Sequence, residues 1–216
     1  MPAKDLRTFL QLLKKKRELR SVHSEVDPKF EISEFLWQAD RLAGPALLFD
    51  RVKGHSSRIV GNLVGTSRRL ALAFGLPGEE KLLEAYQKRR ARETQPKRVK
   101  RGPVKQVVIR EGSQLDLFAF PFPTYHEGDG GPYITCGIVT AKDPASRLRS
   151  MGLHRLQIKG SRKMGIHLTN PPIAAFAAEA ERNGKPLDVA VSVGVHPIIL
   201  LASIVSSSRE NKVGLA

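Results

Sequence analysis

Cysteine, aromatic residues and long apolar runs are all scarce in this chain of 216 residues. A single cysteine excludes an internal disulfide and a cysteine-rich zinc site. No apolar run approaches the roughly 18 residues of a membrane span, and the amino-terminal segment lacks the apolar core of a secretory signal. These absences predict a cytoplasmic protein. A hydrophobic content of 41% with 26% charged residues is ordinary for a globular fold with a proper core.

The two rarest side chains lie in apolar surroundings. Cys136 is within the run YITCGIV, and free cysteine is among the residue types most often buried. We therefore expect a buried, inert thiol rather than a nucleophile. Trp37 lies beside an apolar helical stripe, and we expect it to pack there rather than to form a platform for a ligand.

Acidic residues are also few, with 21 against 36 basic ones, which leaves a net charge of +15. Basic residues concentrate between Lys88 and Lys105 and again between Lys14 and Arg17. Such runs could contact nucleic-acid phosphates or dock an acidic partner subunit. The longer run has no interleaved aromatic residue, no helix-turn-helix spacing and no zinc-ligand pattern. The sequence therefore favours a solvated basic surface over nucleic-acid binding.

Residues 1–103 are predicted to form an amino-terminal unit, an α/β cap of mixed helices and strands. The evidence is apolar periodicity together with helix-capping and helix-stopping residues. The expected elements are a helix capped by Asp5, a second helix ended by Gly44 and Pro45, strands over 46–49 and 58–60, a helix over 68–74 capped by Thr66, and a helix from Pro77 to about residue 91.

Residues 104–216 are predicted to form a second unit, richer in strands. A turn at Asp143 and Pro144 would let two of its strands pair as antiparallel neighbours. The final run, residues 196–208, is apolar with no strand after it, so we expect an exposed apolar face there unless a partner covers it. The expected elements are strands over 104–110, 133–140 and 150–158, a further strand carrying His167, a helix over 171–183 ended by Gly184, a strand over 189–193 and a last helix opened by Pro197.

Strand alternation separates the side chains of the run SMGLHRLQI into two faces. Leu153, Arg155 and Gln157 belong to one face, and His154 belongs to the other. An arginine among such apolar neighbours, if buried, must meet a carboxylate or a phosphate, and its planar fork suits bidentate pairing with either. The segment 130–167 therefore predicts the wall of an anion-binding site.

Other groupings of polar residues carry less weight. His126, Glu127 and Asp129 are close in sequence, but on a turn they have no defined metal geometry, and a solvated loop is the favoured interpretation. The neighbouring glycines are followed by no Lys-Ser or Lys-Thr pair, which argues against a phosphate-binding loop. No arrangement of residues indicates a Ser-His-Asp triad.

Taken together, several motifs resemble those of the UbiD family of decarboxylases. They are GGPYIT, a DP turn, RSMGLHRLQ, GSRKMGIHL, GKPLDVAVSVGVHP and the amino-terminal DLRTFLQLLKKKRELRSV. The resemblance implies an α+β fold in which the cap is followed by a split β-barrel of flavin-reductase type. It also implies a non-oxidative, reversible decarboxylase of aromatic or α,β-unsaturated carboxylic acids. Such enzymes use prenylated FMN, and manganese and potassium help to hold the cofactor phosphate.

The resemblance further implies roles for individual residues and partners. Arg155 matches an arginine that works with two glutamates as a catalytic network. A flavin prenyltransferase would supply the cofactor, and family members commonly self-associate, so a homo-oligomer or a partner subunit is expected. The residues that match cofactor-lining positions are Leu153, His154, Arg155, His167, Leu168 and Thr169.

The sequence also departs from the family pattern. Ser150 stands where the family has a metal-binding asparagine, and a serine hydroxyl is a weaker donor for a hard cation than an amide carbonyl. His154 replaces a tyrosine, and Pro171 and Pro172 take the place of a histidine. Family members are usually more than twice as long and carry their carboxylates beyond the position of Ala216. We therefore expect an incomplete barrel, in either a fragment of an enzyme or a short, noncatalytic accessory subunit.

Overall fold

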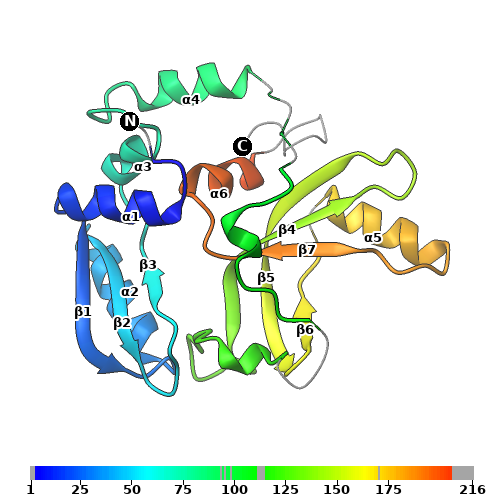
Figure 1. Cartoon of the computed structure of the whole chain (residues 1–216), viewed down its shortest axis with the longest axis horizontal. Coiled ribbons are helices and arrows are strands. Elements are labelled where there is room, and N and C mark those ends of the chain that lie inside the picture. The colour runs from blue at the N-terminus through cyan, green and yellow to red at the C-terminus, as the bar shows by residue number, and fades with distance from the viewer. Residues whose placement is uncertain are drawn as a thin grey trace.

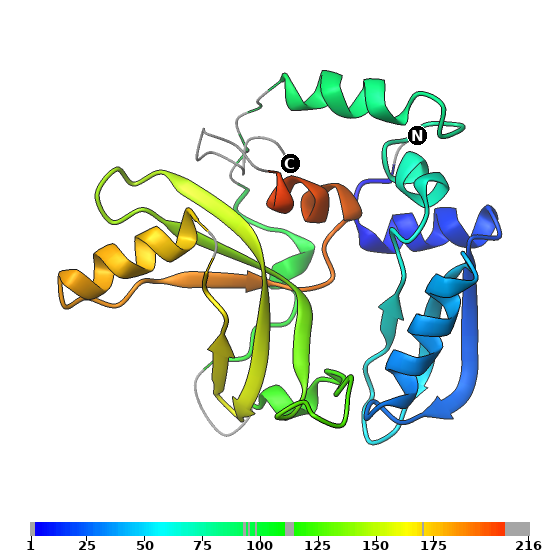
Figure 2. The ribbon, with the colours of Figure 1, turned by 180° about the vertical axis from the view of Figure 1, so that it is seen from behind.

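The chain folds as a mixed α/β structure of two units. A computed structural model describes residues 3–92, 94, 96–97, 99–110, 115–169 and 171–205. Figure 1 shows the two units side by side, with the helix α6 (Pro197–Ile204) between them. Figure 2 shows the same arrangement from behind.

The amino-terminal unit combines a small sheet with helices, as predicted. Asp5 caps the first helix, because its carboxylate accepts a hydrogen bond from the Thr8 N–H at 2.8 Å. Thr66 caps a later helix in the same way through Arg69 N–H. The helix expected from Pro77 begins later, at Leu82. The elements are α1 (Leu6–Lys15), β1 (Leu19–Val26), α2 (Glu31–Arg41), β2 (Ala46–Val52), β3 (Ile59–Gly61), α3 (Ser67–Ala73) and α4 (Leu82–Arg90).

The three strands form one sheet in the order β1-β2-β3. The strands β1 and β2 run parallel and are joined through α2, whereas β2 and β3 are antiparallel. The predicted elements do not include β1, whose segment LRSVHSEV is mostly polar and buries only Val26 fully. This strand is stabilised by its pairing with β2, and no local sequence pattern predicts that pairing.

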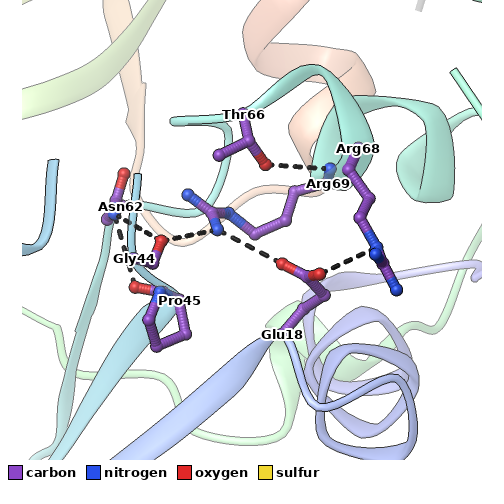
Figure 3. A network of polar contacts seen from close by, with 7 residues as sticks. All are labelled: Glu18, Gly44, Pro45, Asn62, Thr66, Arg68 and Arg69. Atoms are coloured by element: carbon purple, nitrogen blue, oxygen red, sulfur yellow. Dashed lines mark hydrogen bonds and ion pairs between the residues drawn. The ribbon is translucent and has the colours of Figure 1, made fainter. Parts of the chain in front are cut away.

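A buried arginine fastens α3 to this sheet (Figure 3). The side chain of Arg69 is 1% exposed, and its Nη1 donates to Gly44 O at 2.8 Å and to a carboxylate oxygen of Glu18 at 3.3 Å. The second oxygen of Glu18 lies 2.9 Å from Arg68 Nε. Asn62 donates to Gly44 O and so ties the loop after β3 to the same point. The network connects three segments that are distant in sequence.

The second unit is built on a four-stranded antiparallel sheet in the order β6-β5-β4-β7. The sheet curls into a half-barrel in Figure 1. The predicted antiparallel pairing of β4 and β5 is confirmed, whereas the split-barrel architecture stays a prediction. The elements are η1 (Pro103–Lys105), η2 (Leu117–Ala119), β4 (Tyr133–Lys142), β5 (Arg149–Gly160), β6 (Lys163–Ile166), α5 (Ile173–Arg182), β7 (Val189–Ser192) and α6.

Each face of this sheet packs against a different helix. On one face, Val139 and Leu156 belong to a core cluster with Ile173 and Phe176 of α5. On the other face, Ile138 and Met151 form a cluster with Ala202 of α6, to which Leu153 adds a half-buried side chain. We call these the α5 side and the α6 side of the sheet.

The helix α6 and one loop join the two units. The ring of His196, at the start of α6, meets Phe9 of α1 edge-on with ring centroids 5.4 Å apart. In the loop, Thr124 N–H donates to Pro28 O at 3.1 Å, and Phe30 N–H donates to Thr124 O at 2.9 Å. The α6 side of the sheet thus faces the amino-terminal unit. The boundary predicted near residue 103 stays a prediction.

Several local expectations are wrong. Residues 104–110 form no strand; only η1 is regular there, and Val104 is 88% exposed, because β-branched residues alone do not provide a pairing partner. Most of α6 is covered rather than exposed, although Ile204 is 57% exposed; residues 206–208 lie outside the described residues. Trp37 is a surface residue, 53% exposed, under the Arg41 guanidinium.

No helix within the described residues is long and apolar enough to cross a membrane. His167 lies just after β6 rather than within it, since the strand ends at Ile166.

Candidate functional site

The predicted alternation of side chains along β5 is confirmed. Leu156 and Ile158 are buried on the α5 side, and His154 is buried on the same side. Arg155 lies on the α6 side and is exposed. The requirement for a buried partner therefore does not arise for this arginine, and its guanidinium is accessible.

A β-bulge in β4 lies opposite Arg155. The ladder pairs Ile134 with Leu156 and Gly137 with His154, so two residues of β4, Thr135 and Cys136, face the single residue between them on β5. Both are exposed. Since Ile134 and Gly137 both keep their places in the ladder, the two bulge residues turn toward the α6 side, where Arg155 lies.

The bulge corrects the prediction for the thiol. Cys136 is exposed rather than buried, although its neighbours Ile138 and Val139 are core residues. An apolar run predicts burial only if the alternation is unbroken, and the extra residue breaks it. The available signal was Gly137, since an isolated glycine within a strand pattern can indicate a bulge.

Five side chains, three of them exposed and two half-buried, form a polar surface on the α6 side, which we call the Arg155 face. Its residues are Tyr133, Thr135, Cys136, Arg155 and Gln157. The Arg155 guanidinium lies over the Tyr133 ring, 5.6 Å from its centroid. No carboxylate within the described ranges lies at ion-pair distance from this guanidinium. The face therefore presents a cation, held by an aromatic ring, to any ligand between the two units.

A loop from the amino-terminal side of β4 borders the Arg155 face. The Tyr125 hydroxyl lies 2.8 Å from Thr135 Oγ1. The carboxylate of Asp129 accepts hydrogen bonds from the N–H groups of Tyr125 and His126 at 3.1 and 3.0 Å, and Ser33 of α2 donates to Tyr125 O at 2.9 Å. Burial raises the pKa of the Tyr125 phenol, an effect that the hydrogen bond with Thr135 partly opposes.

The same loop approaches β5 at Gly130, and its acidic residues lie on a turn. A Cβ on Gly130 would come within 2.5 Å of Gln157 Nε2, so the loop lies close to β5 here, and a larger residue would displace the end of the Gln157 side chain. His126 and Glu127 are exposed, and Asp129 serves the backbone of its own turn. Among the described residues there is no group of three metal-ligating side chains.

The predicted metal position lies on the opposite side of the sheet. Ser150 is 0% exposed, and its Oγ has no hydrogen-bond partner among the described atoms. His154 is on the same side, with Nδ1 3.4 Å from His167 O. A Cβ on Gly152 would lie 2.7 Å from His154 Nε2, so this glycine leaves space for the imidazole. A lone hydroxyl without neighbouring carboxylates does not fit a divalent cation.

The predicted cofactor-lining residues are brought together, but not all on one side of the sheet. His167 N–H donates to Arg155 O at 3.3 Å, which places the end of β6 beside the middle of β5. His167 and Thr169 are exposed, and Leu168 packs on the α5 core. Exposed polar groups and half-buried leucines beside an accessible guanidinium suit a planar ligand with polar edges, such as a flavin.

A cavity lies away from the Arg155 face. It measures about 820 Å³ and is lined at the far end of the hairpin by Lys142, Arg147 and Arg149, with Lys185 beyond the end of α5. Because it lies at the opposite end of β4 and β5 from the bulge, it is separate from the Arg155 face.

Comparison with known protein families gives two matches that together cover most of the chain. Residues 97–212 match the 3-octaprenyl-4-hydroxybenzoate carboxy-lyase Rift-related domain of UbiD. Residues 10–88 match the 3-octaprenyl-4-hydroxybenzoate carboxy-lyase N-terminal domain. These two ranges correspond closely to the two units of the fold.

Comparison with individual proteins also gives matches over nearly the whole chain. An uncharacterised protein of Synechocystis sp. is 33% identical over 93% of this chain and 45% of its own length. The UbiD-class enzyme HmfF from Pelotomaculum thermopropionicum, solved in complex with FMN, is similar with a TM-score of 0.90 and 38% identity over 98% of this chain and 47% of that one. An evolved dimeric form of HmfF, solved in complex with prFMN, matches with a TM-score of 0.90 and 37% identity over 98% of this chain and 50% of that one.

A third relative is an enzyme named for its substrate. Vanillic acid decarboxylase from Sedimentibacter hydroxybenzoicus, in its open form, has a TM-score of 0.85 and 29% identity over 100% of this chain and 47% of that one. The chain thus spans about half the length of the relatives it matches.

Proposed function

Because the chain belongs to the UbiD family, we propose that it provides the cofactor-binding half of a non-oxidative, reversible decarboxylase of aromatic or α,β-unsaturated carboxylic acids. The match of both units to UbiD domains supports this function, and so does the similarity to decarboxylases of aromatic acids. The chain spans about half the length of its relatives. We therefore include in the same proposal the activity of the whole protein, its acid substrate and its oligomeric partner.

The observation that carries the proposal is the accessible guanidinium of Arg155. It lies over the Tyr133 ring and has no acidic partner within the described residues. A planar guanidinium of this kind binds a carboxylate through two parallel charge-assisted hydrogen bonds. In the proposed reaction Arg155 binds and orients the carboxylate that is lost, with the ring of the acid held against the face between the two units.

Prenylated FMN is the proposed cofactor, and its electron-accepting ring would supply the sink for the electrons released as CO2 departs. The residues proposed to hold it are Leu153, His154, Arg155, His167, Leu168 and Thr169. The ring of His154 is on the α5 side, with Nδ1 near His167 O. His154 would therefore act indirectly, by orienting the segment that carries His167. No step is assigned to manganese or potassium, since Ser150 and its described neighbours do not form a site for them.

The single cysteine offers a direct test. Cys136 is exposed beside Arg155, so a neutral reagent such as N-ethylmaleimide should alkylate it, and mass spectrometry can follow the reaction. Benzoate or vanillate bound at Arg155 should slow alkylation in a saturable manner. Arg155→Met should weaken this protection strongly. Arg149→Met, which removes an exposed arginine at the far end of β5, should retain it. Equal labelling with and without acids in the unaltered protein would contradict the proposed function.

The cofactor is tested separately by co-expression with a flavin prenyltransferase in the presence of manganese and potassium. A yellow protein with a flavin absorption spectrum would support the assignment, and a colourless one would remove its support. A noncatalytic accessory subunit is the second candidate, favoured by Ser150 in place of the family asparagine. That candidate predicts neither protection of Cys136 by acids nor bound flavin.

A further inference from the structure

The bulge in β4 adds a second ligand-contacting group to the Arg155 face. We infer that Thr135, oriented by Tyr125, contacts the acid bound at Arg155 and selects acids whose ring carries a hydroxyl or similar hydrogen-bonding group. This inference rests on the proposed function, because it assumes that an aromatic carboxylate binds at Arg155. It adds two residues that would determine specificity and that the sequence motifs do not single out.

The ladder brings Thr135 close to Arg155. Residues that face one another across antiparallel strands have Cβ atoms roughly 5 Å apart. The bulge gives the position opposite Arg155 two side chains, Thr135 and Cys136, both on the α6 side and both exposed. A molecule the size of a benzoate that binds the guanidinium therefore lies within reach of the threonine.

The hydroxyl of Thr135 has hydrogen-bonding capacity to spare. Two hydroxyl groups together offer two donors and about four acceptor sites. The contact between Tyr125 and Thr135, at 2.8 Å, uses one donor and one acceptor, so one donor and further acceptors are available to a ligand. A β-branched side chain has few rotamers, and the bond to Tyr125 restricts Thr135 further.

Tyr125 is suited to a positioning role because its own backbone is held from two directions. Asp129 accepts its N–H, and Ser33 of the amino-terminal unit donates to its carbonyl. Burial raises the pKa of its phenol, so the group stays neutral and keeps its proton in physiological conditions. The pair thus presents a neutral hydrogen-bonding site beside a cationic one. Such a pair matches a carboxylic acid with a phenolic substituent.

Matched acids separate this inference from the proposed function. Benzoate and 4-hydroxybenzoate differ only in one hydroxyl, and their dissociation constants can be measured by titrating the protection of Cys136 from N-ethylmaleimide, with isothermal calorimetry as an independent readout. The unaltered protein should bind 4-hydroxybenzoate about 3- to 10-fold more tightly than benzoate, the range expected for one neutral hydrogen bond.

Two variants test the residues. Thr135→Val keeps the shape of the side chain but removes the hydroxyl, and it should weaken binding of 4-hydroxybenzoate to the level of benzoate while leaving benzoate within about 2-fold. Tyr125→Phe should reduce the ratio of the two affinities in the same direction. A merely structural role for Tyr125 would weaken both acids alike and leave the ratio unchanged. Circular dichroism of each variant checks that it is folded.

Each outcome has a definite meaning. Collapse of the ratio in Thr135→Val with benzoate binding retained supports the inference. A ratio that does not change in Thr135→Val overturns it, as does a loss of FMN binding without any change for the acids, which would assign Thr135 to the cofactor. If Arg155→Met leaves both acids bound, or if neither acid binds the unaltered protein, the proposed function fails and the inference falls with it.

Discussion

Two arginines, one in each unit, show how the same side chain serves different purposes. Arg69 is buried in the amino-terminal unit, where it donates to Glu18 and to Gly44 O. Arg155 is exposed in the second unit, where its guanidinium lies over the Tyr133 ring and has no acidic partner among the described residues. Desolvation makes a buried charge dependent on its protein partners, whereas an exposed, unpaired one is available to a ligand. Burial and pairing, rather than residue type, separate structure from function here.

The largest effect on stability is expected at Arg69. Replacement by methionine should lower the free energy of unfolding by about 3 kcal/mol, because Glu18 loses its buried partner and Gly44 O loses a donor. Urea denaturation followed by circular dichroism measures this change. Arg155→Met, the matched replacement in the second unit, should stay within about 0.5 kcal/mol. A similar decrease in the free energy of unfolding for both variants would contradict the proposed difference in role between the two arginines.

The reverse pattern is expected for ligand binding. Arg155→Met should weaken protection of Cys136 by benzoate by about 10- to 100-fold, since a charge-assisted hydrogen bond contributes roughly 1.5–3 kcal/mol. Arg149→Met is the control, because it removes the same charge from the same strand far from the bulge. Weakening by Arg149→Met of the same size would mean that net charge, and not the Arg155 face, attracts the acid.

The joint between the two units should respond to pH through His196. Burial, the main cause, lowers the pKa of this imidazole below 6.5, while Asp5 partly opposes the shift. Its Nδ1 accepts the Ile198 N–H at the start of α6, which only the neutral ring can do. The unfolded chain therefore binds the proton more tightly, so stability present above about pH 6.5 falls as the pH is lowered through the folded-state pKa.

His196→Asn provides the comparison, since asparagine also caps helices but does not titrate. Between pH 7.5 and 5.5 the free energy of unfolding of the unaltered protein should decline more steeply than that of this variant. The depressed pKa values of Asp5 and Asp143 act at lower pH, because their unfolded-state value is 3.8, and do not interfere in this window. Parallel profiles for the two proteins would remove His196 as the cause.

The smallest effect is expected at Ser150. Its buried hydroxyl has no partner among the described atoms, so Ser150→Ala should leave stability unchanged or raise it by up to about 1 kcal/mol. Thermal unfolding measures the difference. A loss of more than about 1 kcal/mol would show that the hydroxyl binds something in solution, and manganese dependence of that loss would restore the metal site that its position suggests.

Much of the fold follows from local patterns. Asp5 and Thr66 cap helices as predicted, and the turn after Asp143 joins two antiparallel strands. These features depend on residues a few positions apart. The strand β1, by contrast, is polar and is stabilised by pairing with β2, and the apolar residues near Val104 find no partner. Pairing across the sequence has no local signature, so β1 was missed and the strand predicted over 104–110 was wrong.

The candidate site was predictable only in part. Alternation along β5 correctly separated Arg155 from His154. The bulge that exposes Cys136 and Thr135 was missed, because one inserted residue reverses the faces without altering the composition of the strand. Nothing in the sequence distinguishes buried Arg69 from the many exposed arginines, since its partner Glu18 lies 51 positions away.

Alkylation of Cys136 by N-ethylmaleimide in the presence of increasing vanillate tests the central claim most directly. The account predicts saturable protection in the unaltered protein, loss of protection in Arg155→Met, and retention in Arg149→Met. Protection that is absent from the unaltered protein, or that survives the loss of the Arg155 guanidinium, would contradict it.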